Sequence, residues 1–331
     1  MKSVSDVRTT GVRATDVRTT ARVTINHPQL SKIHKRISLA TILLPSLGVV
    51  FALVLWVIRG RVEPVSVALF VGFFVLNQLG VEVGFHRLFS HSAYKAHPWV
   101  RAGLAILGST AAQGPVINWS ATHRRHHPSS DQPGDPHSPH YRKKSCGEEA
   151  ALSGFKGFYH AHTGWMLTGE ITNSAVFTKD LLRDPVLTKI NRWYFGWVAL
   201  GLAIPTLIGG WVTHSWIGGL EGFLWGGLVR IFVVHHVTWS SNSFCHLFGQ
   251  RPFETDDNST NNIWLAIPTI GIAWHNNHHA FPNSALHGLE WWQIDLGAWF
   301  IRALEKVGLA WDLRVPNAQM KQSKRRQANG V

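Results

Sequence analysis

Four long apolar segments dominate the hydropathy pattern of the chain. Residues 38–58 contain no Lys, Arg, Asp or Glu, and residues 65–84 are apolar except for polar side chains near their end. Two further segments, 193–212 and 217–237, are separated by only a few residues. Each is close to the roughly 20 residues that a helix needs to cross a bilayer. The pattern therefore predicts four membrane-spanning helices arranged as two hairpins.

Three shorter apolar segments interrupt the polar remainder of the chain, and they are rich in Trp or small residues. They are 99–117, 263–274 and 291–311. Segments of this kind are typical of interfacial or re-entrant helices that seat a cap on the membrane. The fold class we expect is all-α, with a cytoplasmic helical cap on the four spans. A single membrane domain over 27–315 is expected between a basic, disordered N-terminal tail, 1–26, and a basic C-terminal tail, 316–331.

Charge and composition set the orientation and exclude several classes of protein. Nearly all of the 32 Lys and Arg residues lie in 1–37, 86–192 and 239–331. Because Lys and Arg are retained on the cytoplasmic side, we expect both termini and the cap there, in a bacterial cell membrane. The net charge of +13 has no clustered stripe of the kind that binds nucleic acid, so membrane lipid is the expected partner. Two Cys residues are too few for a disulfide-stapled scaffold.

The most informative feature is a set of histidines near the ends of the spans. They are His86, His91, His123, His126, His127, His246, His275, His278 and His279. On a helix, His-x-x-His-His aims three imidazoles into one region. Adjacent histidines differ by about 100° in direction, so they serve two metal ions more easily than one. Imidazole suits iron, zinc, copper and nickel, and an all-nitrogen dinuclear site at a membrane surface favours iron chemistry with O₂ on an acyl chain.

The three boxes 86–91, 123–127 and 275–279 resemble those of the membrane-bound fatty acyl desaturases, in particular the stearoyl-CoA (Δ9) branch. The likeness covers residues 35–315. It extends to Asn-Ser-Phe-Cys-His at 242–246 and to the Asp-Gln-Pro-Gly-Asp-Pro-His stretch that ends at His137.

This resemblance implies an O₂-dependent enzyme with two iron ions that introduces a cis double bond, at Δ9, into a saturated acyl chain. It assigns His86, His127, His275 and His279 to one iron. It assigns His91, His123, His126, His246 and His278 to the other, with Asn242 acting through a water. It places Gln113, Trp119, Thr238 and Trp239 at the bend of a substrate tunnel, and Phe74 and Gln78 at its far end. Electrons are expected from a separate ferredoxin, cytochrome b5 or reductase.

Some positions depart from the acyl-CoA pattern and leave the acyl carrier open. Acyl-CoA members place an Arg-Asp pair before the second box, where this chain has Ala121 and Thr122. A second basic pair is replaced by Thr168 and Gly169. Acyl-CoA, acyl carrier protein and phospholipid are therefore all candidate forms of the substrate.

Two other functions compete with the desaturase. One is a fatty acid or lipid hydroxylase of the same histidine-box superfamily. The other is a His-rich membrane metal transporter, although transporters place their ligands near the bilayer midplane and these histidines lie at or beyond the span ends. Asp131 and Asp135 either orient the imidazoles or belong to a Pro-Gly turn, and His287 is expected to be ordinary.

Overall fold

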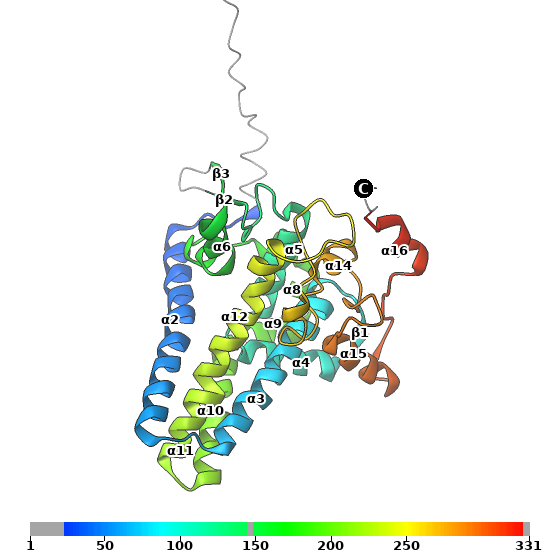
Figure 1. The fold of residues 1–331 in the computed structure, drawn as a ribbon. Helices are drawn as coiled ribbons and strands as arrows, with labels where there is room; N and C mark the ends of the chain where they lie inside the picture. Colours follow the sequence, from blue (N-terminus) through cyan, green and yellow to red (C-terminus); the bar gives the residue numbers. More distant parts are fainter. Residues whose placement is uncertain (1–22, 144–147, 327–331) are drawn as a thin grey trace, which may run out of the picture.

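The computed structural model describes residues 23–143 and 148–326, and four of its helices are long and apolar enough to cross a membrane. These candidate spans are Pro28–Arg59, Pro64–Ser90, Tyr194–Thr213 and Trp216–His246. They run side by side as a bundle with the cap at one end (Figure 1). The predicted all-α architecture of four spans in two hairpins is confirmed.

The first span, helix α2 (Pro28–Arg59), begins ahead of its predicted boundary. His27 caps its N-terminus by accepting a hydrogen bond from Leu30 N, and Pro28 stands in the first turn, where a missing N–H costs nothing. The helix therefore extends beyond the apolar segment 38–58 at its N-terminal end, and these first turns are basic. It ends at Gly60, whose φ of 70° is the left-handed conformation that glycine adopts readily.

The second and fourth spans change helix type along their length. Helix α3 (Pro64–Gln78) continues as the π-helix η1 (Leu79–Ser90), and α11 (Trp216–Glu221) continues through the π-helix η4 (Gly222–Val229) into α12 (Arg230–Ser243). The third span is α10 (Tyr194–Thr213). π-Helical turns are frequent at functional sites, and η1 carries the first histidine box.

A buried carboxylate joins the two hairpins at the end of the bundle that is far from the histidines. Glu221 pairs with Arg59 and accepts a hydrogen bond from Glu63 N at 2.8 Å. Its side chain is 2% exposed. The turn of the first hairpin is thereby tied to the start of the fourth span.

A second buried ionic group, Arg230, lies inside the fourth span. Its guanidinium donates to Asn77 Oδ1 at 2.5 Å and to the carbonyls of Thr110, Gly201 and Gly226 at 2.7–3.0 Å. A charge at membrane depth is tolerated when protein groups surround it in this way. Arg230 therefore holds three spans and the first cap helix together.

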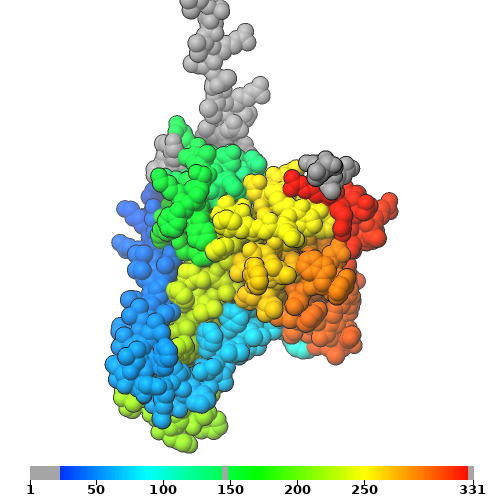
Figure 2. All heavy atoms as spheres, in the orientation of Figure 1, coloured from blue at the N-terminus to red at the C-terminus, as the bar shows by residue number. Residues whose placement is uncertain are grey.

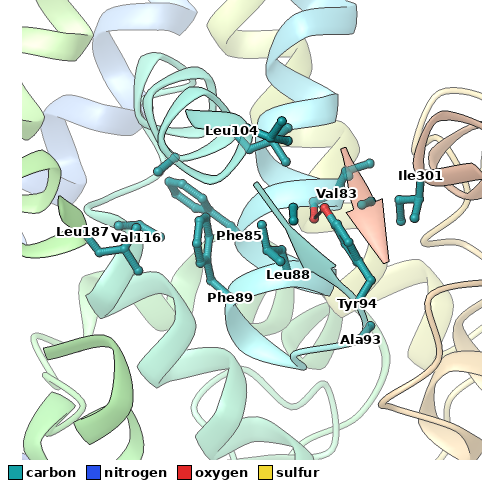
Figure 3. Packing of buried hydrophobic residues seen from close by; sticks show 14 of the residues in the cluster. Val83, Phe85, Leu88, Phe89, Ala93, Tyr94, Leu104, Val116, Leu187 and Ile301 are labelled. Atoms are coloured by element: carbon teal, nitrogen blue, oxygen red, sulfur yellow. Dashed lines mark hydrogen bonds between the residues drawn. The ribbon is translucent and has the colours of Figure 1, made fainter. Parts of the chain in front are cut away.

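The cap is built on an apolar cluster beside η1. Val83, Phe85, Leu88 and Phe89 of η1 pack with side chains from the cap helices, such as Leu104 (Figure 3). The cap helices beside it are α4 (Pro98–Thr110), α5 (Val116–His126), α9 (Pro185–Arg192) and α15 (Leu296–Lys306). This packing fixes the end of the second span against the helix that carries the second histidine box.

The rest of the cap consists of short elements. They are η2 (His127–Ser129), α6 (Gly154–His162), η3 (Gly164–Leu167), α7 (Ser174–Phe177), α8 (Lys179–Leu182), η5 (Phe244–His246), α13 (Ile263–Ala266), α14 (His275–Ala280) and α16 (Ala318–Lys324). Strands β1 (Lys95–Ala96) and β4 (Ala310–Trp311) pair antiparallel, as do β2 (Tyr141–Lys143) and β3 (Glu149–Ala151). In the space-filling view the cap overhangs the bundle on one side (Figure 2).

Only part of each predicted tail lies within the described residues. Residues 1–22 and 327–331 lie outside the described residues, so the N-terminal tail 1–26 is represented by 23–26 alone. Within that stretch, Ile25 N donates to Ile171 O at 2.8 Å. In the C-terminal tail, α16 is anchored to the cap because Lys324 Nζ donates to Ala280 O at 2.7 Å.

Candidate metal centre

The histidines singled out by the sequence converge into two groups at the junction of the spans and the cap. The first group is His86, His91, His123, His127 and His278. The second group is His126, His246, His275 and His279. Within each group the candidate ligand atoms all lie within 4.8 Å of one another. That size matches a coordination shell with metal–nitrogen bonds of about 2 Å.

Helix periodicity explains how one box serves both groups. In 123–127 and in 275–279, the first and last histidines are four residues apart and therefore share a helix face. His123 and His127 both point into the first group, while His275 and His279 both point into the second. The middle histidine of each box, His126 or His278, points into the other group.

This arrangement corrects the grouping that the resemblance implied. His86 and His127 were expected beside His275 and His279, but they lie with His91 and His123 instead. Conversely, His126 and His246 were expected with His91 and His123, but they lie with His275 and His279. The implied assignment split the His123–His127 pair, which α5 and the first turn of η2 keep on one face.

The ring nitrogens face inward in both groups. In the first group, Nε2 of His91 and Nε2 of His123 are 2.7 Å apart, and Nε2 of His278 lies 3.0 Å from that of His127 and 3.1 Å from that of His86. In the second group, Nε2 of His275 lies 3.0 Å from that of His246. An imidazole nitrogen that faces another at this distance can donate to it only if one of the two carries the proton, so the facing Nε2 atoms cannot all satisfy one another. Such a donor set fits a metal cation, for which neutral imidazole is a preferred ligand.

Carboxylates behind the rings hold these nitrogens in place. The Nδ1 atoms of four histidines contact a carboxylate: His86 with Glu82 at 3.0 Å, His126 with Asp135 at 3.0 Å, His246 with Asp131 at 2.7 Å, and His279 with Asp257 at 2.5 Å. A carboxylate that accepts from Nδ1–H leaves Nε2 deprotonated and directed at the metal. This second set of contacts favours the orienting role for Asp131 and Asp135 over the turn alone.

Electrostatics keeps the cap carboxylates charged. Burial by itself would raise the pKa of Asp131, but the facing His246 ring and the hydrogen bond from Asn258 N outweigh burial and lower it. The pKa of Asp257 is likewise lowered, because His279 and the Ser259 hydroxyl outweigh the effect of burial. Both groups are therefore ionised near neutral pH and act as strong acceptors.

Sequence reasoning missed three of the residues that lie behind the histidine rings. Glu82 and Asp257 were not assigned a role, and His287 was expected to be ordinary. His287 Nδ1 lies 3.3 Å from Glu82 Oε1, and its ring centroid lies 4.6 Å from that of His278. Burial lowers the pKa of His287 to about 4, so its ring is neutral. Glu82 was detectable, because it precedes His86 by four residues on one helix, but Asp257 carried no local signal.

A cavity of about 540 Å³ lies against the two groups and is lined by members of both, including His123 and His275. Five of the expected substrate residues and the expected water-linked ligand also line it. They are Gln78, Gln113, Trp119, Thr238, Trp239 and Asn242. Gln113 connects two of the others, since its Nε2 donates to Thr238 Oγ1 at 2.8 Å and its Oε1 accepts from Trp119 Nε1 at 3.3 Å.

Phe74 is the one expected substrate residue that does not line this cavity. It lies one turn before Gln78 on α3 and packs against Val81, Ala111 and Val234. Its ring also stacks on Phe70, with centroids 6.3 Å apart. Phe74 shares a face of α3 with Gln78, but it lies one turn beyond the cavity lining, against the lining residue Val81.

Comparison with known proteins places this geometry in a family. The fatty acid desaturase profile matches residues 63–313. The chain is 45% identical over 304 residues to a hex-5-enoyl-[acyl-carrier protein] acetylenase of Moorena producens (strain JHB), covering 91% of this chain and 93% of the relative. It is 38% identical over 254 residues to an sn-1 stearoyl-lipid 9-desaturase of Anabaena variabilis (76% and 84%). It is 36% identical over 245 residues to Delta-9 acyl-lipid desaturase 1 of Arabidopsis thaliana (74% and 73%).

Proposed function

Because the chain belongs to the fatty acid desaturase family, we propose that it introduces a cis double bond at carbon 9 of a saturated acyl chain, using two iron ions and O₂. The observation that carries the proposal is the pair of inward-facing histidine groups on the wall of one cavity. The names of the Anabaena and Arabidopsis relatives support position 9.

The two groups supply the ligands. The first group would hold one iron through His86, His91, His123, His127 and His278, and the second would hold the other through His126, His246, His275 and His279. Asn242 lines the same cavity and would reach the second iron through a water. When bound, the irons would supply the O₂-derived oxidant that removes hydrogen from an unactivated C–H bond.

The reaction needs electrons from outside the chain. Two hydrogens leave the acyl chain as the double bond forms, and O₂ is reduced to two waters with two added electrons and two added protons. A separate one-electron donor, such as a ferredoxin, cytochrome b5 or a reductase, would deliver these electrons. With the positive-inside rule, the histidine-bearing end and both termini would face the cytoplasm of a bacterial cell.

The chain's own residues would position the substrate. The Trp119–Gln113–Thr238 network joins α5, the loop after α4 and α12, so it holds three walls of the cavity at a fixed separation. The ring of Trp119 also stacks on His123, with centroids 5.3 Å apart. A chain bent against this network would present one pair of carbons to the histidine groups, and this positioning gives regioselectivity.

The Moorena relative supports a second candidate reaction at the same site. That protein is named for acting on an already unsaturated acyl chain on a carrier protein. The same removal of two hydrogens from a double bond would give a triple bond, so acetylenase activity is tested beside desaturation.

The deciding experiment is fatty-acid profiling of a desaturase-deficient host that expresses the chain, with unsaturation located by mass spectrometry. We expect new cis monoenes in the wild type and none in His278→Ala. His97→Ala is the matched control, because His97 is exposed and belongs to neither group. Hydroxy fatty acids without new unsaturation would favour the hydroxylase, and zinc or manganese uptake by iron-free protein in vesicles would favour the transporter.

A further inference from the structure

The turn that follows α4 has an unusual backbone conformation. Ala112 has a φ of 57°, in the left-handed region that a residue with a side chain rarely adopts. The next residue is Gln113, whose side-chain amide connects Trp119 to Thr238 in the cavity wall. The conformation of this turn therefore sets where Gln113 stands. A contact that holds the turn also acts on the wall against which the acyl chain would bend.

Helix α12, which runs through the middle of the bundle toward the cap (Figure 1), supplies such contacts from about two of its turns. Arg230 donates to Thr110 O at 2.8 Å, and Thr238 Oγ1 accepts from Gln113 Nε2 at 2.8 Å. Between these two contacts, His235 Nε2 lies 2.9 Å from Ala111 O and donates to it. Each of these positions of the turn is therefore held by a different side chain of α12.

His235 reaches the cavity wall from behind. It is 1% exposed, lies inside the candidate span Trp216–His246 and is not one of the residues that line the cavity. Its ring packs against Trp239, which does line the cavity, with centroids 4.9 Å apart. An ionisable side chain at membrane depth is costly and is a candidate for function. Here one imidazole contacts both the turn that carries Gln113 and the indole of Trp239.

We propose that His235 is a positioning residue that fixes which pair of carbons is desaturated, by holding the turn 110–113 against α12. The inference rests on the proposed function and names a residue that determines its regioselectivity. Without the hydrogen bond to Ala111 O, Ala112 can leave its left-handed conformation and the Gln113 amide can move away from Thr238. The bend of the acyl chain then shifts relative to the histidine groups, and a shift of one carbon changes the product.

The position of the double bond is the first readout. In the desaturase-deficient host, the wild type should place the double bond at one position of the host's own acyl chains. In His235→Leu, the fraction of double bonds at neighbouring positions should rise at least about fivefold, the factor that corresponds to one lost hydrogen bond. His235→Gln keeps an N–H donor at the same reach from the backbone and should restore the wild-type position. An unchanged single position in His235→Leu would overturn the proposal.

The matched control is His236→Leu. The ring of His236 also lies against Trp239, with centroids 5.2 Å apart, but its Nδ1 faces His162 Nε2 on α6 at 2.9 Å. This variant loses a ring beside Trp239 and keeps the hydrogen bond to Ala111 O, so its products should match the wild type at equal iron content and thermal midpoint. Equal redistribution in the two Leu variants would contradict the role of the hydrogen bond. If His235→Leu does not accumulate, His235→Phe removes the donor and keeps a ring against Trp239.

Hydrogen exchange of the metal-loaded protein tests the turn without turnover. The amides of 111–114 are followed by mass spectrometry of a peptide that contains them. His235→Leu should speed their exchange at least about fivefold, because the turn opens more often without its hydrogen bond. His235→Gln and His236→Leu should exchange at the wild-type rate. Unchanged exchange in His235→Leu would show that the turn holds its conformation without this residue, which would overturn the proposal.

A double substitution tests whether His235 acts through the turn that carries Gln113. Thr238→Val removes the other end of the Gln113 hydrogen bond, so both substitutions release the same turn from α12. The increase in misplaced double bonds in the double variant should be close to that of the stronger single variant. An increase equal to the product of the two single effects would mean that the residues act independently, and would refute this route.

The two readouts separate the positioning role from the proposed function. If the wild type forms no new unsaturation, the desaturase proposal fails, and hydrogen exchange alone decides whether His235 holds the turn. If the wild type forms a double bond whose position is the same in His235→Leu, although exchange at 111–114 is faster, the desaturase stands and the positioning role fails.

Discussion

The contact between Asp131 and His246 offers a sharp test of the ligand assignment. Asp131 is 1% exposed and accepts from His246 Nδ1 at 2.7 Å, Asn258 N at 2.8 Å and Ser138 Oγ at 3.2 Å. In Asp131→Asn, the amide group turns N–H toward at least one of these donors and removes the negative charge. His246 then loses the acceptor that keeps its Nε2 directed into the second group.

The size of the effect follows from this geometry. Removing such a partner from a metal-ligating histidine lowers metal affinity by about 10- to 100-fold, or about 1.4 to 2.8 kcal/mol. His246 belongs to the second group only. The loss should therefore affect one ion, and Asp131→Asn should release metal in two separate steps as chelator is increased.

The assay measures iron per chain after dialysis against graded chelator. The control is Asp312→Asn, which makes the same chemical change in a carboxylate that pairs with Lys95 at 2.8 Å and is 61% exposed. We expect the control to release its iron at the same chelator concentration as the wild type. Asp131→Asn should release about half of its iron at a lower chelator concentration. Circular dichroism of the loaded variant verifies its fold. Retention of both ions at the wild-type chelator concentration, or their simultaneous loss, would refute the reasoning.

Three further predictions address the site and the bundle. Chelation should lower the thermal midpoint of unfolding, because the inward-facing imidazoles lose their shared cation. Added iron should restore both the midpoint and desaturation, whereas zinc should restore the midpoint alone. An unchanged midpoint in metal-free protein would contradict the site. Thr238→Val should remove the Gln113 hydrogen bond, lower the unfolding free energy by about 0.5–1.5 kcal/mol and broaden the distribution of double-bond positions seen by mass spectrometry, whereas Thr188→Val on α9 should leave the products unchanged. Arg230→Leu should leave Asn77 Oδ1 and three backbone carbonyls without their guanidinium donor, and lower the free energy of unfolding in detergent by about 2 kcal/mol or more. A variant as stable as the wild type would show that these contacts contribute little.

The sequence predicted the spans and singled out the histidines that the structure brings together, because both signals are local. An uncharged stretch of bilayer length identifies a span wherever it occurs, and a histidine box needs only helical spacing to present a common face. The boundaries shifted where capping overrode hydropathy, as at Pro28, and where the backbone changed to π-helix after Gln78. Neither change leaves a periodic signal in the residues.

The parts that sequence reasoning missed depend on contacts between distant segments. Asp257 reaches His279 only after the loop that follows the fourth span has folded back. The grouping of the histidines depends on how α5 and α14 are rotated relative to each other, which no single box records. Phe74, expected with Gln78 at the far end of the tunnel, lies one turn beyond the cavity lining in an apolar cluster with Val81.

The position of α14 has a consequence for how the protein matures. Both histidine groups draw members from His275–Ala280, which follows all four spans in a chain that is made from its N-terminus. A ribosome that has already delivered all four spans to the bilayer has not yet produced a complete set for either ion. A nascent chain therefore has four histidines of the first group but only two of the second until His275–Ala280 is made, so the second centre depends on α14 more than the first does.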